Sequence, residues 1–138
     1  MRPFDLLTTA HYRLLAVLWT VGILLALSIP TGNFARVQPE FGIDKIVHAV
    51  LFAGFGGLWL RSLCPPGTKE LARCFRWRGG LFFVAGVVFA VGTEVYQQLL
   101  PVRRVADPYD VTADLAGFIL AFAGYYAYHV RPANRMSP

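Results

Sequence analysis

The chain has 138 residues, of which 56% are hydrophobic and 15% are charged, with a mean hydropathy of +0.49 and a formal net charge of +5. Because a soluble domain of this size is about 45–50% apolar and roughly 25% charged, the composition excludes an ordinary soluble domain and predicts one domain embedded in a membrane. The basic excess is explained by membrane orientation and by contact with anionic lipid, so nucleic acid is not expected as a partner.

The first apolar block predicts a membrane-spanning helix over residues 13–30, because residues 14–35 contain no Asp, Glu, Lys or Arg. A secretory signal is the alternative, but the segment Leu14–Ile29 is longer than an ordinary signal core and lacks a small-residue cleavage site, so we expect a retained helix. An outer loop over residues 31–42 follows. The uncharged stretch Ile46–Leu60 then predicts a second helix over residues 43–62.

Residues 63–79 predict an inner loop, because this segment contains Pro65, Pro66 and Gly67 and four of the 13 basic residues. Its two cysteines, Cys64 and Cys74, match no zinc spacing and lie on the reducing side, so we expect unpaired thiols. A third helix is predicted over residues 80–100, then a short outer loop over 101–109 and a fourth helix over 110–130. The predicted fold is thus a single all-α integral membrane domain, residues 1–138, with four transmembrane helices.

The orientation follows from where Lys and Arg fall. Placing the N-terminus inside puts nine of the 13 basic residues on the inner side, and six of the eight acidic residues on or near the outer side. Cytoplasmic loops carry the excess of Lys and Arg, so both termini are predicted to be cytoplasmic. Glycines mark the helix faces expected to pack against neighbours, since they let backbones approach closely; they are Gly54, Gly56, Gly57, Gly86, Gly92, Gly117 and Gly124.

Three of the predicted helices carry a polar pair spaced by one turn near their outer ends: Asp44 and His48, Glu94 and Gln97, and Asp110 and Asp114. Ionisable groups at membrane depth are costly and usually functional. Glu94 lies about 21–22 Å along its predicted helix, and we expect it to meet His48 and Asp114 in a recessed pocket open to the outer face.

We assign roles within this pocket from residue type. The candidate catalytic residues are Glu94, His48 and Asp114, and the candidate ligand-binding residues are Asp44, Lys45, Gln97, Arg103, Arg104 and Asp110. No metal ligand and no cofactor are assigned. Simpler roles compete with these: Lys45 can snorkel to the interface, Asp110 can cap the fourth helix, and the two arginines can neutralise nearby carboxylates or touch lipid phosphate.

The order of these motifs resembles the VanZ-like family. Its first half is matched by Ser28-Ile29-Pro30 and by Asp44-Lys45-x-x-His48 followed by Phe52; its second half is matched by Glu94-x-x-Gln97, Pro101, Arg104, Asp110 and Ala113-Asp114-x-x-Gly117. The resemblance covers about residues 28–125. Two features depart from it: many members carry Asn where Asp114 stands, which makes this pocket more acidic, and Arg103 is an additional basic residue.

The resemblance implies a four-helix, multi-pass protein of the bacterial cytoplasmic membrane. The family is named for a member associated with low-level resistance to teicoplanin-type glycopeptides, which concerns the cell envelope but establishes no reaction. Our first hypothesis is a pocket in the outer leaflet that binds an anionic lipid or a lipid-linked cell-wall intermediate, with or without a chemical step on it. Arg103, Arg104 and Lys45 would hold phosphate or carboxylate, with His48 and Glu94 as acid and base.

Two other classes of function stay open. One is an intramembrane hydrolase or transferase, with or without a divalent metal, which uses His48 and Glu94; the sequence has no HExxH or serine-nucleophile motif in its favour. The other is a non-catalytic assembly factor, in which buried ion pairs only fix the helix register. Whether the protein is an enzyme is therefore undecided, and a homo-oligomer is compatible with each of the three.

Overall fold

The computed structural model describes residues 7–28, 43–99 and 108–132, and every regular element among them is helical. The elements in chain order are α1 (Thr9–Ser28), α2 (Ile43–Leu63), α3 (Leu71–Cys74), the π-helical turn η2 (Phe75–Gly79), α4 (Gly80–Leu99), α5 (Pro108–Tyr125) and the π-helical turn η3 (Tyr126–Val130). The all-helical class predicted from the sequence is confirmed.

Four stretches of helix are long and apolar enough to cross a membrane, as predicted. They are Thr9–Ser28, Asp44–Leu63, Leu71–Leu99 and Pro108–Val130, with 20, 20, 29 and 23 residues. At a rise of about 1.5 Å per residue, 20 residues span the roughly 30 Å of hydrocarbon in a bilayer. This count and composition are those of a multi-pass membrane protein.

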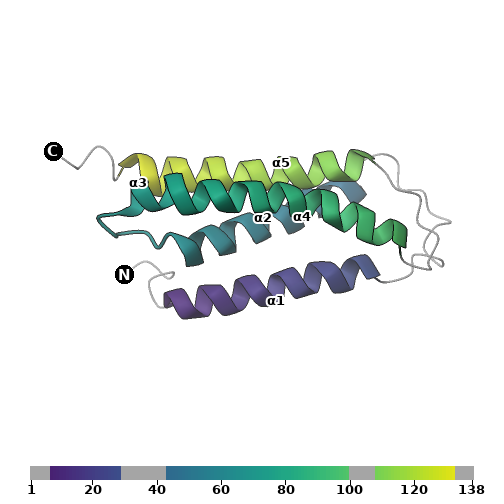
Figure 1. Cartoon of the computed structure of the whole chain (residues 1–138), viewed down its shortest axis with the longest axis horizontal. Coiled ribbons are helices and arrows are strands. Elements are labelled where there is room, and N and C mark those ends of the chain that lie inside the picture. Colours follow the sequence, from purple (N-terminus) through teal and green to yellow (C-terminus); the bar gives the residue numbers. More distant parts are fainter. Residues whose placement is uncertain (1–6, 29–42, 100–107, 133–138) are drawn as a thin grey trace.

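The helices form an elongated bundle in which α1 and α4 run in one direction and α2 and α5 in the other (Figure 1). As a result, α1 begins at the end where α2 and η3 finish; we call this the basic end, since seven of the eight Lys and Arg among the described residues lie at or near it. The opposite end, where α2 and α5 begin, is called the acidic end. The most extensive packing is between α2 and α5, followed by that between α1 and α2.

Glycines set the closest helix contacts. A Cβ on Gly117 of α5 would lie 1.9 Å from the carbonyl oxygen of Ala49 on α2, and one on Gly86 would lie 2.1 Å from the Phe118 ring. Gly56 similarly faces α5. The predicted packing role therefore holds for these positions. A Cβ on Gly57, Gly92 or Gly124 would instead meet no atom within 4 Å, so that these three do not serve close packing.

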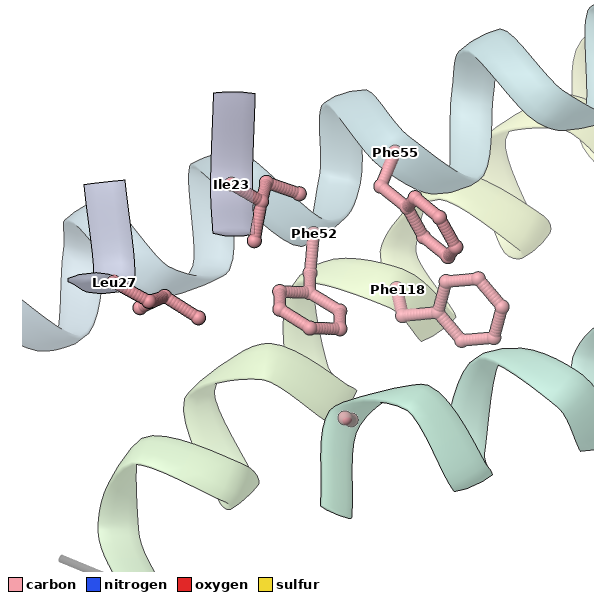
Figure 2. Close-up of a cluster of buried hydrophobic side chains, with 6 residues drawn as sticks. Ile23, Leu27, Phe52, Phe55 and Phe118 are labelled. Carbon is pink, nitrogen blue, oxygen red and sulfur yellow. The ribbon is translucent and has the colours of Figure 1, made fainter. Parts of the chain in front are cut away.

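Aromatic side chains fill the centre of the bundle. Phe52 and Phe55 of α2 and Phe118 of α5 are buried beside Ile23 and Leu27 of α1 (Figure 2). The Phe55 and Phe118 ring centroids are 5.9 Å apart, within the range of favourable aromatic pairs. This core fixes the rotation of α2 and α5 about their axes, and hence where their first turns point.

The helix at the N-terminus begins four residues earlier than predicted, because Thr8 caps it. The Thr8 hydroxyl accepts a hydrogen bond from the backbone N–H of His11 at 3.4 Å, and the His11 ring Nδ1 lies 3.2 Å from the backbone nitrogen of Thr8 in return. This reciprocal arrangement is the geometry of a capping box. Likewise, α5 begins at Pro108 rather than at residue 110, with proline at the first helical position, where its missing N–H costs nothing.

The predicted inner loop over residues 63–79 is wrong for most of its length. Helix resumes at Leu71 and continues without a break into α4. The arginines that suggested a loop, Arg73, Arg76 and Arg78, are good helix formers, and their long side chains can reach the polar boundary from a helix. The helix widens into the π-helical turn η2 between α3 and α4, and into η3 after α5. These two turns pack through Phe75 and Tyr126, whose ring centroids are 5.8 Å apart.

The expectation of unpaired cysteines is also wrong, because Cys64 and Cys74 form a disulfide. The helical turn of α3 folds back towards the end of α2 and brings the two Cα atoms to 5.6 Å, inside the range that a disulfide requires. Tyr125 of α5 donates a hydrogen bond to the Cys64 carbonyl, which ties α5 to the end of α2 beside the disulfide.

Candidate functional site

Two of the three predicted polar pairs meet at the acidic end, because α2 and α5 start there side by side and run in the same direction (Figure 1). The contact of Gly117 with the Ala49 backbone brings the two helices close at the depth of the polar residues. Ala49 directly follows His48, and Gly117 lies about one turn after Asp114, so both polar residues lie next to the closest approach. The spacing of one turn then places Asp44 and Asp110 on the same faces.

His48 and Asp114 form a buried hydrogen-bonded pair. The Nδ1 atom of His48 lies 2.9 Å from Oδ1 of Asp114, and the two residues are 7% and 2% exposed. With Asp114 as a carboxylate, which can only accept, Nδ1 carries the proton and donates it. A neutral His48 ring then keeps Nε2 as an acceptor, the tautomer required of a general base or of a metal ligand.

The second pair, Lys45 and Asp110, lies one turn closer to the acidic end than His48 and Asp114. The Lys45 ammonium donates a hydrogen bond to Oδ1 of Asp110, and both side chains are mostly shielded from solvent. The other oxygen of Asp110 lies 3.8 Å from Nε2 of His48. Asp110 therefore connects the lysine to the histidine, and it lies inside the first turn of a helix that begins at Pro108, which does not fit the role of its N-cap.

Three of these residues have the donor types that hold a divalent metal. One ligand atom each from Asp44, His48 and Asp110 falls within 4.8 Å of the others. Carboxylate oxygen and imidazole nitrogen bind ions such as Zn²⁺ or Mn²⁺, and a metal-binding histidine commonly donates its other ring N–H to a carboxylate. Asp114 stands in that position. Because Lys45 forms an ion pair with Asp110, a metal ion would compete with the lysine for that carboxylate.

The α4 residues occupy the same end of the bundle but do not join the pair. Glu94 is half-buried, and Gln97, one turn further along, is 5% exposed. Among the described residues, the hydrogen bonds and ion pairs of His48 and Asp114 go to each other and to Asp110, with none to Glu94. Tyr96, which shares this end, is hydrogen-bonded to Ser28 of α1 at 2.7 Å.

Arg103 and Arg104, the remaining predicted ligand-binding residues, lie outside the described residues. The structure thus brings together Asp44, Lys45, His48, Asp110 and Asp114 from α2 and α5. Sequence reasoning did not identify Ala49 as part of this site. The sequence did contain a signal for this contact: the small residue Ala49 directly follows His48, and the glycine Gly117 lies one turn after Asp114.

Comparison with protein-family models, curated proteins and solved structures finds no match for this chain. The chemistry of the site therefore follows from its own geometry.

Proposed function

We propose that this chain is a VanZ-like, multi-pass protein of the bacterial cytoplasmic membrane whose acidic end binds an anionic lipid or a lipid-linked cell-wall intermediate in the outer leaflet. The observation that carries this proposal is the buried His48–Asp114 pair, formed between two helices and flanked by the Lys45–Asp110 ion pair. Polar groups placed this way inside apolar helices are rare unless they serve a function.

Insertion into a membrane is supported by the outer surface of the bundle. Large apolar side chains point away from the core on each long helix, among them Leu25 on α1, Val50 on α2, Val88 on α4 and Leu120 on α5, all more than half exposed. In water such a surface would drive aggregation. In hydrocarbon these apolar side chains are in a favourable environment, and each helix forms its backbone hydrogen bonds within itself.

The orientation follows from the charge at the two ends. Basic residues near membrane helices stay on the cytoplasmic side, so the basic end would face the cytoplasm and both termini with it. This orientation places the Cys64–Cys74 disulfide where thiols are ordinarily kept reduced. The two indications conflict. We give precedence to the charges, because they act during insertion of the helices.

The chemistry available at the acidic end is proton transfer beside a bound anion. Asp114 holds the His48 ring in one tautomer, as the aspartate of a hydrolytic triad does, and leaves Nε2 to take a proton from a substrate hydroxyl or from water. Lys45 is already paired with Asp110. Arg103 and Arg104 would then supply the cations for a phosphate, in the bidentate mode that suits guanidinium. By its resemblance, the protein would belong to the cell envelope, with a link to teicoplanin-type glycopeptide resistance.

A metal-assisted hydrolase or transferase is the second candidate, and the grouping of Asp44, His48 and Asp110 favours it. A divalent ion held there would polarise a phosphoryl oxygen or lower the pKa of a bound water. Asp114 would orient the histidine from behind.

Native mass spectrometry of the protein released gently from bacterial membranes tests both candidates. The samples are the wild type, His48→Gln, Arg104→Ala and, as a matched control at the opposite end, Glu70→Gln, which changes an exposed carboxylate. A phosphorus-containing lipid that is lost in the first two variants and kept in the control supports the lipid pocket. A divalent metal lost in His48→Gln but kept in Arg104→Ala supports the metal-assisted enzyme. Bare protein in all samples contradicts both candidates and favours the non-catalytic assembly role.

A further inference from the structure

A groove of 680 Å³ opens at the basic end, between α1, α2 and the last turns of α5 and η3. It lies on the opposite half of the bundle from the His48–Asp114 pair: its basic residue, Arg61, is about 20 Å further along α2 than His48. Its lining includes Tyr12, Gly54, Gly57, Leu58, Arg61 and Tyr128, with His129 beside them.

The floor of the groove is one face of α2. Gly54, Gly57, Leu58 and Arg61 recur at the spacing i, i+3, i+4 and i+7, which keeps them on one side of a helix. The floor extends about 10 Å along the helix axis, from Gly54 near mid-span to Arg61 in the last turn. It is therefore apolar along most of its length and cationic at the end near the membrane boundary.

Gly57 keeps this groove open. Gly54 makes room for the Trp19 indole, which would lie 2.7 Å from an added Cβ and which donates a hydrogen bond to the Leu51 carbonyl at 2.9 Å. A Cβ on Gly57 would meet nothing within 4 Å. The absence of a side chain at Gly57 therefore serves no contact between helices and leaves an apolar channel along α2.

Arg61 holds a cation at the mouth of the groove. Its guanidinium carbon lies 5.0 Å from the centre of the Tyr12 ring, a cation–π contact that holds the charged group beside this ring. Among the described residues no carboxylate lies within salt-bridge distance of Arg61, in contrast to Arg73, which pairs with Glu70. The same side chain also borders a second cavity of 350 Å³ beside Thr8 and the first turn of α1.

We propose that this groove binds one anionic phospholipid, with the lipid phosphate on Arg61 and an acyl chain lying over Gly57. The groove has the polarity of a phospholipid: a cation at the membrane boundary and an apolar floor that leads towards the bilayer centre. Tyr128, at the rim, offers an amphipathic side chain suited to the headgroup region. The excess of basic residues at this end raises the local concentration of anionic lipid. This site is separate from the one at the acidic end.

The test is lipid titration of the purified full chain, followed by native mass spectrometry, with phosphatidylglycerol and phosphatidylcholine of identical acyl chains. We expect one molecule of phosphatidylglycerol to bind tightly, and Arg61→Gln to weaken its binding about tenfold, since a charged hydrogen bond to phosphate is lost. Gly57→Leu, which fills the channel, should weaken binding of both lipids. Gly22→Leu is the matched control, because a Cβ on Gly22 also meets open space but lies outside the groove.

Three results would overturn the proposal: equal affinity of the wild type for the two lipids, unchanged phosphatidylglycerol binding by Arg61→Gln, or equal loss in Gly57→Leu and Gly22→Leu. Far-ultraviolet circular dichroism checks that each variant keeps its helical content. If Gly57→Leu fails to fold, the comparison of Arg61→Gln with Arg61→Lys decides, because lysine restores the charge and should recover part of the selectivity.

Discussion

The hydrogen bond between His48 and Asp114 can be measured as a coupling energy. The perturbation is a double-mutant cycle of His48→Ala, Asp114→Ala and the double variant, since each single change leaves one buried polar group without its partner. Charge-assisted hydrogen bonds contribute about 1.5–3 kcal/mol, whereas hydrogen bonds between membrane helices average about 0.6 and reach about 1.7 kcal/mol. This pair is short, buried and charged, so we expect a coupling of about 1.5–2 kcal/mol.

The assay is equilibrium unfolding in mixed detergent micelles, followed by loss of helical circular dichroism. The exposed pair Glu70 and Arg73 is the control: its atoms are 3.9 Å apart and its side chains are 74% and 76% exposed, so its coupling should not exceed about 0.5 kcal/mol. Asp114→Asn should lose less stability than Asp114→Ala, because the amide oxygen still accepts from Nδ1. If the His48 and Asp114 changes are additive within about 0.5 kcal/mol, the pair does not hold the site together and the reasoning fails.

Three other outcomes are expected from contacts elsewhere in the bundle. Gly117→Val should cost at least about 2 kcal/mol in unfolding measurements, because its Cβ would collide with the Ala49 carbonyl, while Gly92→Val, in open space, should cost less than half of that; equal losses would contradict the packing role of Gly117. Tyr125→Phe removes the hydrogen bond to the Cys64 carbonyl and should lower the unfolding free energy by about 1 kcal/mol, and an unchanged value would show that this bond contributes nothing. A C-terminal green fluorescent protein fusion should fluoresce and the corresponding alkaline phosphatase fusion should be inactive; the reverse result would place the basic end outside, in agreement with the disulfide rather than with the charges.

The helices and the polar pairs could be predicted because both depend on local patterns. Long uncharged blocks identify spans, and a spacing of one turn places Asp44 with His48, and Asp110 with Asp114, on single helix faces. The helical segment from Leu71 could not be recognised in the same way. Its basic residues were interpreted as a loop signal, although they are neutral to favourable for helix formation.

Which polar residues of the site pair with each other depends on how the helices pack, and this packing could not be predicted from the sequence. The depth of Glu94, estimated from its position along the helix, gives no information on the rotation of α4, so its expected contact with His48 could not be decided from the sequence. The rotation of α2 against α5, in contrast, is set by the aromatic core and by the close contact between Gly117 and Ala49, and this packing brings Asp114 to His48. The disulfide was missed for a different reason: the compartment argument concerned redox conditions and not the distance between Cys64 and Cys74.

The formal charge of the acidic end separates the two candidate functions. Three carboxylates, Asp44, Asp110 and Asp114, and one ammonium, Lys45, sum to −3 + 1 = −2 when His48 is neutral. Such a group attracts a divalent cation without further help and repels phosphate. An anionic lipid can therefore bind here only with further cations, and Arg103 and Arg104 are the candidates for that role. For this reason, loss of a ligand on removal of Arg104 is the sign of an anion, whereas a cation would be bound more tightly by that variant.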